Sequence, residues 1–161
     1  MVCSCCLRRR ATRVWWHLSD SAILCWTLSS SRKQRGDLGY DSSVYNELVL
    51  EHFRNPRNAG KLANATAEVQ ATNPVCADIL ELAARVENGA IVEARFLCRG
   101  CTASIACASM LTERLTGCTV AAARAITAET ISEALGELPP ATFHGAQLAA
   151  DALRLLVDKL A

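Results

Sequence analysis

Two cysteines and an aspartate have the side chains and the spacing for metal or sulfur chemistry. Cys101 follows Gly100, where strand-like alternation over 91–97 gives way to a helical pattern. A cysteine at a helix N-terminus lies beside unpaired N–H groups and the positive end of the helix dipole, which favour its thiolate form. Cys76 and Asp78 come just before the same predicted hairpin. We therefore predict that Cys101 binds metal or sulfur, the alternative being a small residue in a tight strand-to-helix joint.

The predicted hairpin explains how these side chains can meet. Residues 80–87 and 91–98 alternate between apolar and polar side chains, and Asn88-Gly89 between them is a strong hairpin turn. Antiparallel strands bring the residues before the first strand beside those after the second. The three side chains should therefore lie together at one end of the sheet.

His144 is a fourth candidate, near the start of the last predicted helix and after Pro139-Pro140. Alternatively, it is a capping or surface residue. Two thiolates, a carboxylate and an imidazole can form a tetrahedral zinc site, and thiolates are also the ligands of iron–sulfur clusters. The predicted ligand set is Cys76, Asp78, Cys101 and His144.

The other cysteines of this region are weaker candidates. Cys98 and Cys101 form a Cys-x-x-Cys pair, which elsewhere indicates thiol–disulfide exchange. Strand alternation, however, places Cys98 with the core-facing residues. Cys107 lies about 9 Å along the predicted helix from Cys101, and Cys118 about 25 Å. Neither should join the ligands.

The remaining pattern predicts an α+β fold, a three-stranded antiparallel sheet with about five helices on one face. The outer strand covers 67–71, and the return strand turns Ile91 outward with Glu93 and Arg95. A helical stripe begins at Tyr45, and a second helix ends at Gly117. Ser42 and Ser43 are the predicted N-caps of the first helix. Two shorter helices are predicted over 119–126, with Thr119 as N-cap, and over 128–136, with Thr127 as N-cap. A final helix is predicted over 144–160.

Composition limits the class of protein. With 161 residues the chain is long enough for one domain with a real core, and a net charge of +1 indicates neither nucleic acid nor a membrane surface as partner. Of the nine cysteines, five belong to a region that needs no disulfide framework. We expect a reducing, cytoplasmic location.

Residues 1–43 differ from the rest. They hold all three tryptophans and seven basic against three acidic residues, whereas 44–161 holds ten basic and thirteen acidic residues. The apolar run 22–28 is too short to span a bilayer. We interpret 1–43 as an extraneous or disordered extension from a start site assigned too early, with a degenerate targeting peptide as the alternative. The functional domain is then 44–161.

From Tyr45 onward the chain resembles the NifU/IscU family of iron–sulfur cluster assembly scaffolds, specifically its N-terminal NifU domain. The matching segments are Glu51-His-Phe-Arg-Asn-Pro-Arg-Asn-Ala-Gly60, Asn73-Pro-Val-Cys-Ala-Asp78, Arg99-Gly-Cys-Thr-Ala-Ser-Ile-Ala106, Leu138-Pro-Pro140 and 144–151. The resemblance implies a SufE/NifU-like sandwich and a scaffold rather than an enzyme. A cysteine desulfurase would deliver sulfur, iron would be added, and a [2Fe–2S] cluster would pass to recipient apo-proteins. Zinc is expected in the same site when no cluster is present.

Three positions depart from the family pattern. Gly145 stands where the family has its third cysteine, and Ala77 stands where the family has glycine. The segment read by the family's dedicated chaperone appears as Leu138-Pro-Pro-Ala-Thr142 without its lysine, so that partnership is not expected. Because Gly145 lies at a predicted helix start, we expect a cysteine there to be tolerated.

Two other functions stay open. One is a zinc-bound sulfur relay that accepts persulfide from a cysteine desulfurase. Relays of this family carry an extra segment between the second and third ligand positions, whereas here Cys101 and His144 are only 43 positions apart, which favours the scaffold. The other is a degenerate member that acts only through protein contacts.

Overall fold

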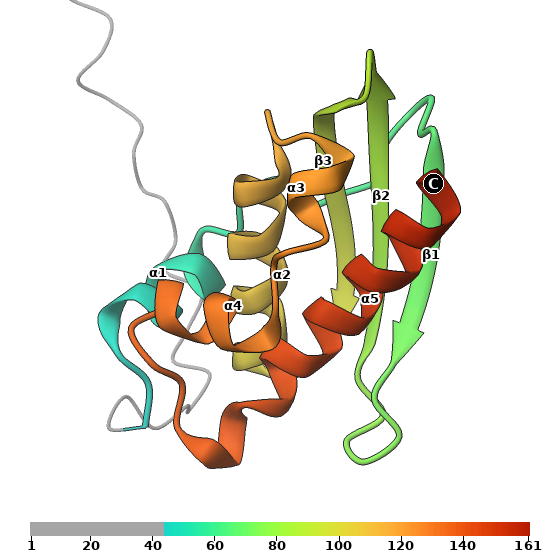
Figure 1. The fold of residues 1–161 in the computed structure, drawn as a ribbon. Helices are drawn as coiled ribbons and strands as arrows, with labels where there is room; N and C mark the ends of the chain where they lie inside the picture. The colour runs from blue at the N-terminus through green and yellow to red at the C-terminus, as the bar shows by residue number, and fades with distance from the viewer. Residues whose placement is uncertain (1–43) are drawn as a thin grey trace, which may run out of the picture. The chain divides into compact units, whose positions relative to one another are not determined.

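The computed structural model describes residues 44–161 and places a three-stranded sheet against a layer of helices (Figure 1). The strands are β1 (Ala67–Thr72), β2 (Ile79–Glu87) and β3 (Ala90–Arg99), antiparallel and adjacent in chain order. The predicted α+β class with helices on one face of the sheet is confirmed. Residues 1–43, including the predicted caps Ser42 and Ser43, lie outside the described part of the chain.

The β2–β3 hairpin brings two distant segments together as predicted. Asn88 and Gly89 have φ angles of 52° and 77°, the left-handed pair of a tight hairpin turn. At the other end of the ladder Ile79 pairs with Arg99. The residues that precede β2 and those that follow β3 therefore lie side by side.

A β-bulge corrects one prediction for β3. Arg85 pairs with Glu93 but Val86 pairs with Ile91, so Val92 is an extra residue on β3. One inserted residue reverses the side to which the preceding side chain points. Ile91 is fully buried as a result, and the prediction that it faces outward with Glu93 is wrong.

The helices follow the predicted order with changed ends. They are α1 (Glu47–Arg54), α2 (Thr102–Leu115), α3 (Val120–Ala123), α4 (Ala128–Ala134), the 3₁₀ turn η1 (Pro140–Thr142) and α5 (His144–Leu160). Within the described chain α1 is capped by Asn46, whose Oδ1 accepts the Val49 N–H at 3.0 Å. The predicted bounds of α5 and the two threonine caps are confirmed.

Two predicted helices are shorter than expected. After Ala123 the chain makes i→i−3 bonds from Ala125 and Ile126, so the α-helix tightens and ends before 126. Helix α4 ends because Gly136 adopts a φ of 78° and the Glu137 N–H bonds back to the Ser132 carbonyl.

The core lies between the sheet and the pair α2 and α5. Helix α5 packs on β1 and β2, whereas α2 packs on β3, α1 and α5. Small buried residues along α2 let these neighbours approach closely: Ala103, Ala106, Ala108 and Ser109. Within 44–161, no helix has the length and apolar character to cross a membrane.

Candidate functional site

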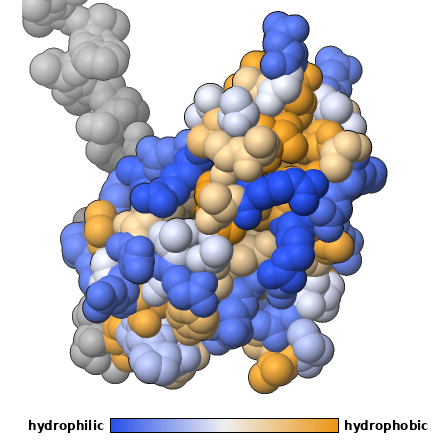
Figure 2. All heavy atoms as spheres, viewed as in Figure 1, coloured by the Kyte–Doolittle hydropathy of each residue, from blue (hydrophilic) through white to orange (hydrophobic). Residues whose placement is uncertain are grey.

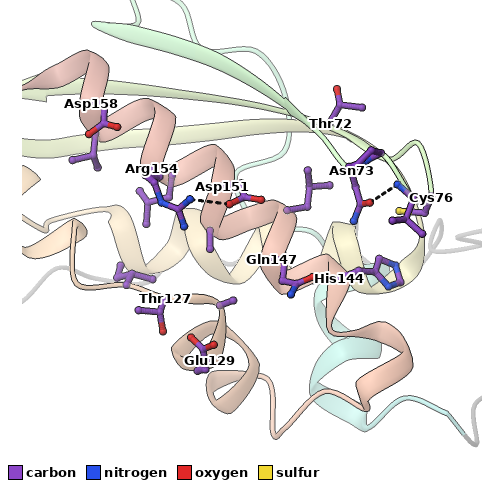
Figure 3. A pocket seen from close by; sticks show the side chains of 18 of the residues that line it. Thr72, Asn73, Cys76, Thr127, Glu129, His144, Gln147, Asp151, Arg154 and Asp158 are labelled. Carbon is purple, nitrogen blue, oxygen red and sulfur yellow. Dashed lines mark hydrogen bonds and ion pairs between the residues drawn. The ribbon is translucent and has the colours of Figure 1, made fainter.

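The four predicted ligands meet at the N-terminal end of α2. One possible ligand atom from each of Cys76, Asp78 and His144 lies within 4.8 Å of the other two. Cys101 is not part of this group of three but lies next to it, with its Sγ 3.5 Å from His144 Nε2. Figure 3 shows Cys76 and His144 beside each other at one end of a pocket, from the β1–β2 loop and α5. The predicted grouping is confirmed for Cys76, Asp78 and His144, and Cys101 lies beside Asp78 and His144, while metal binding by these residues stays a prediction.

The β1–β2 loop presents Cys76 to solvent. Asn73 shapes this loop by accepting the Val75 N–H on Oδ1 at 2.8 Å and donating its own N–H to the Asp78 carbonyl at 2.9 Å. Ala77 has a φ of 57°, a region that favours glycine. Cys76 is exposed at the tip of this closed loop and is accessible to a partner.

The carboxylate of Asp78 is buried against the start of α2. Its Oδ2 accepts the Cys101 N–H at 3.2 Å and the Ser104 hydroxyl at 2.5 Å. Burial raises the pKa of Asp78, but the bonds from Ser104, the Cys101 amide and the two thiols outweigh it and leave that pKa below its usual value. Asp78 is therefore ionised at neutral pH and available to a cation.

His144 is oriented by the backbone of η1. Its Nδ1 lies 3.1 Å from the Ala141 carbonyl oxygen. A carbonyl only accepts, so Nδ1 carries a proton, and in the neutral ring the lone pair is then on Nε2, which faces Cys101. An imidazole held in this tautomer by a backbone carbonyl is typical of metal-binding histidines.

The other described thiols are not arranged as ligands. Cys98 packs against the core as predicted, and burial, with the nearby charges of Asp78 and Cys101, raises its pKa to about 12. Burial likewise raises the pKa of Cys107, which is fully buried. The Sγ of Cys118 donates to the Arg114 carbonyl at the far end of α2. Cys76 and Cys101 are the two thiols that face the site.

The structure overturns the expectation that Gly145 tolerates a cysteine. A Cβ atom at Gly145 would lie 2.9 Å from the backbone carbon of Ala103 and 2.9 Å from the backbone nitrogen of Ser104. These are main-chain atoms of the first turn of α2, where α5 crosses it, and they cannot swing aside as a side chain can. A cysteine at this position requires α5 to move.

A groove leads away from the site along α5 (Figure 3). Its volume is about 1060 Å³, and it runs from Cys76 and His144 to Arg124 and Asp158. Arg154 and Asp151 form an ion pair of 3.2 Å on its wall. Hydrophilic and hydrophobic residues are interspersed over this face, as Figure 2 shows. The site is thus open on the groove side and closed on the α2 side.

Sequence reasoning missed Ser104. The residue is 1% exposed, bonds to Asp78, and has its Oγ 3.4 Å from Cys101 Sγ. A signal was present, because Ser104 is the third residue of α2, the position whose side chain commonly bonds back to the N-cap residue. Nothing in the local pattern indicated that Asp78 would stand between the two.

The site therefore offers one sulfur atom, one imidazole nitrogen and one carboxylate oxygen around a common point, with the sulfur atom of Cys101 beside the imidazole. This donor set suits zinc or iron and is softer than the all-oxygen sites of Mg²⁺ or Ca²⁺.

Comparisons with known proteins match most of the described part of the chain. The family described as NifU-like N terminal domain matches residues 44–160. The iron–sulfur cluster assembly scaffold protein IscU 1 of Archaeoglobus fulgidus is 42% identical over 111 residues, which cover 69% of this chain and 72% of the relative. IscU of Escherichia coli K12 is 38% identical over 118 residues, 71% of this chain and 91% of the relative.

A solved structure supports the fold. The crystal structure of a candidate scaffold protein of the SUF system from Fervidobacterium islandicum AW-1 superposes with a TM-score of 0.58. It is 20% identical and covers 73% of this chain and 99% of its own.

Proposed function

Because the chain belongs to the NifU-like N-terminal domain family, we propose that it is an iron–sulfur cluster assembly scaffold that builds its cargo on Cys76, Asp78, Cys101 and His144. The observation that carries the proposal is the meeting of two thiols, a carboxylate and an imidazole at the start of α2. The role is that of a carrier and not of an enzyme.

The donor set fits a [2Fe–2S] cluster as cargo. Such a cluster takes two protein ligands on each iron, and the site offers four donors. Replacement of thiolate by imidazole raises the reduction potential of a cluster of this type. A set with fewer thiolates also binds soft metals less tightly, so the mixed donor set suits a cluster that is held and then given up. Zinc suits the same four donors and would occupy them in competition with iron.

Each residue has a distinct part in this proposal. Cys76 is exposed on its loop and would meet a sulfur donor first. Cys101 lies at the N-cap of α2, where the helix dipole favours negative charge. His144 contributes Nε2, and Asp78 contributes a carboxylate whose negative charge is stabilised by two hydrogen bonds.

The expected partners follow from this chemistry. A cysteine desulfurase would supply sulfur, and recipient apo-proteins of the cytoplasm would take the finished cluster. The groove beside Cys76 and His144 gives either partner access to the site. The charges on its walls are of both signs, and Arg154–Asp151 and Arg124–Asp158 pair with each other, so neither nucleic acid nor a membrane surface is expected to bind there.

Anaerobic reconstitution with Fe²⁺ and sulfide tests the function. Wild-type protein should gain visible sulfur-to-iron charge-transfer absorption and then pass the cluster to an apo-ferredoxin. Cys101→Ser should lose both. Cys118→Ser is the matched control, since it removes a thiol at the far end of the same helix and should behave as wild type.

A parallel incubation with a cysteine desulfurase and cysteine, which supply sulfur already at the persulfide level, separates the alternatives. Zinc retention with a persulfide on Cys76 or Cys101, and no cluster, would indicate a sulfur relay. Absence of metal, cluster and persulfide alike would indicate a protein that acts through contacts alone. Equal cluster yield from Cys101→Ser and wild type would show that the site lies elsewhere.

A further inference from the structure

A buried serine holds one oxygen of Asp78 in place. Ser104 is 1% exposed and Asp78 is 7% exposed. The Ser104 hydroxyl donates to Asp78 Oδ2 at 2.5 Å, and the Cys101 N–H donates to the same oxygen at 3.2 Å. Both donors belong to the first turn of α2, 23 and 26 residues after Asp78 in the chain.

The arrangement replaces an ordinary helix cap. Cys101 is the N-cap residue of α2, and its side chain makes no capping bond. In a capping box the side chain of the third helical residue would bond directly to the N-cap N–H. Here the carboxylate of Asp78 stands between the Cys101 N–H and the Ser104 hydroxyl and bonds to both. The loop that carries Asp78 is thereby fastened to the start of the helix.

Gly100 shows that this close approach is part of the fold. A Cβ atom at Gly100 would lie 2.8 Å from both Cγ and Oδ2 of Asp78. Any other residue would therefore push the carboxylate away from the helix start. Gly100 does not have the left-handed backbone that demands glycine, so the nearby carboxylate is the reason a side chain cannot be accommodated.

We propose that Ser104 is a positioning residue that fixes Asp78 as a ligand through a single oxygen. With Oδ2 engaged by two donors, Oδ1 is the oxygen left for a metal shared with Cys76 and His144. Ser104 itself does not bind the metal. It acts through Asp78, as residues behind the ligands of a metal site do when they set the orientation of a ligand. This inference shares one assumption with the proposed function, namely that the site binds a metal.

Cobalt binding tests the role of Ser104 without any cluster. Co²⁺ is titrated into wild type, Ser104→Ala, Asp78→Ala and the double variant, and its visible bands report affinity and coordination. Ser104→Ala should weaken Co²⁺ binding by about 10–100-fold and shift the ligand-field bands as the carboxylate reorients. In the Asp78→Ala background the same change should have no further effect, since its target is gone.

Ser109→Ala is the matched control. Ser109 is a second buried serine on α2, and its partners are His52 and the Arg57 backbone rather than a predicted ligand. Its removal should lower the melting temperature of the apo-protein and leave Co²⁺ affinity unchanged. Gly100→Ala is a second test variant on an exposed position and should weaken Co²⁺ binding in the same Asp78-dependent way.

The outcomes separate this inference from the function. The positioning role is overturned if a folded Ser104→Ala variant binds Co²⁺ as tightly as wild type. It is also overturned if Ser104→Ala weakens Co²⁺ binding equally in the wild-type and the Asp78→Ala backgrounds. If Ser104→Ala does not fold, Gly100→Ala takes its place: the positioning role is overturned if Gly100→Ala leaves Co²⁺ affinity unchanged or weakens it equally with and without Asp78. Failure of wild type to bind Co²⁺ also overturns it. Co²⁺ binding with the expected coupling, but no cluster on reconstitution, sustains the positioning role and refutes the scaffold.

Discussion

Helix α2 carries two buried serines, and each is the centre of a different polar group. Ser104 bonds to Asp78 at the N-terminal end, where Cys101 and His144 keep donor atoms directed at a shared point. Ser109 lies within hydrogen-bonding distance of His52 Nδ1 at 2.9 Å and accepts the Arg57 N–H at 2.8 Å. The two histidines differ accordingly. His144 is half-buried with Nε2 facing a thiol, whereas His52 is 3% exposed with Arg57 against its ring.

This difference separates a site from a structural joint. Around Ser109 the polar atoms satisfy one another, and Arg57 is paired with Glu51 and Glu113. Burial lowers the pKa of His52, and the charge of Arg57 lowers it further, against weaker opposing effects of Glu113 and Glu51. A neutral histidine beside a cation is not arranged to take a metal ion. The same residue types therefore fasten α1 to the middle of α2 and form a candidate metal site at its N-terminal end.

Exchange of the two histidines for alanine should give opposite results. His52→Ala should lower the free energy of unfolding by about 3 kcal/mol, because it leaves a cavity and removes a buried hydrogen bond. Its Co²⁺ affinity should stay at the wild-type value. His144→Ala should lose Co²⁺ affinity with little change in stability, because the side chain is partly exposed. Urea unfolding and cobalt titration of both variants check this, and similar profiles would contradict the division of roles.

Gly145→Cys tests how closed the α2 side of the site is. The new side chain meets the backbone of Ala103 and Ser104, so we expect a loss of about 1–3 kcal/mol, as for overpacking. Gln147→Cys is the control, since Gln147 lies two residues after Gly145 on α5 and is exposed on the groove. It should be nearly neutral. If Gly145→Cys melts at the wild-type temperature, the close packing of α5 on α2 is wrong.

The pH dependence of stability should report His52. Its pKa is lowered on folding, so the unfolded chain binds this proton first as the pH falls. The stabilisation is complete above the unfolded pKa of about 6.5 and is lost as the pH falls from there through the folded pKa. Urea unfolding of wild type and His52→Asn between pH 8 and pH 5 should show this loss in wild type alone. An equal slope in both proteins would rule out His52 as the source.

The smallest expected effect is at Ala77. A φ of 57° is less favourable in free energy for alanine than for glycine, which favours the Ala77→Gly variant. Glycine, however, loses more backbone conformational entropy on folding, which opposes that gain. Ala77→Gly should therefore change stability by at most about 1 kcal/mol in the stabilising direction. Thermal melting of the apo-protein measures it, with Ala121→Gly on the exposed face of α3 as a control that should destabilise. A clear loss of stability in Ala77→Gly would show that the loop does not hold a left-handed residue there.

Local pattern was enough for the elements and for the meeting of the ligands. Alternation and the Asn88-Gly89 turn located the hairpin, and that hairpin required Cys76, Asp78 and Cys101 to share one end. Apolar spacing gave α5 its ends. These features are carried by residues close in sequence, because periodicity and turn geometry depend on a few neighbouring residues.

The details that decide the chemistry depended on tertiary contacts. An inserted Val92 turned Ile91 inward, and the crossing of α5 over α2 removed the space for a side chain at Gly145. The hydrogen bond between the Ser104 hydroxyl and the Asp78 carboxylate joins residues 26 positions apart in the chain. It forms only because the β1–β2 loop packs against the start of α2. Sequence periodicity does not predict such contacts. They depend on the separation of two elements to within a few tenths of an ångström, and that separation is set by all the side chains packed between the elements.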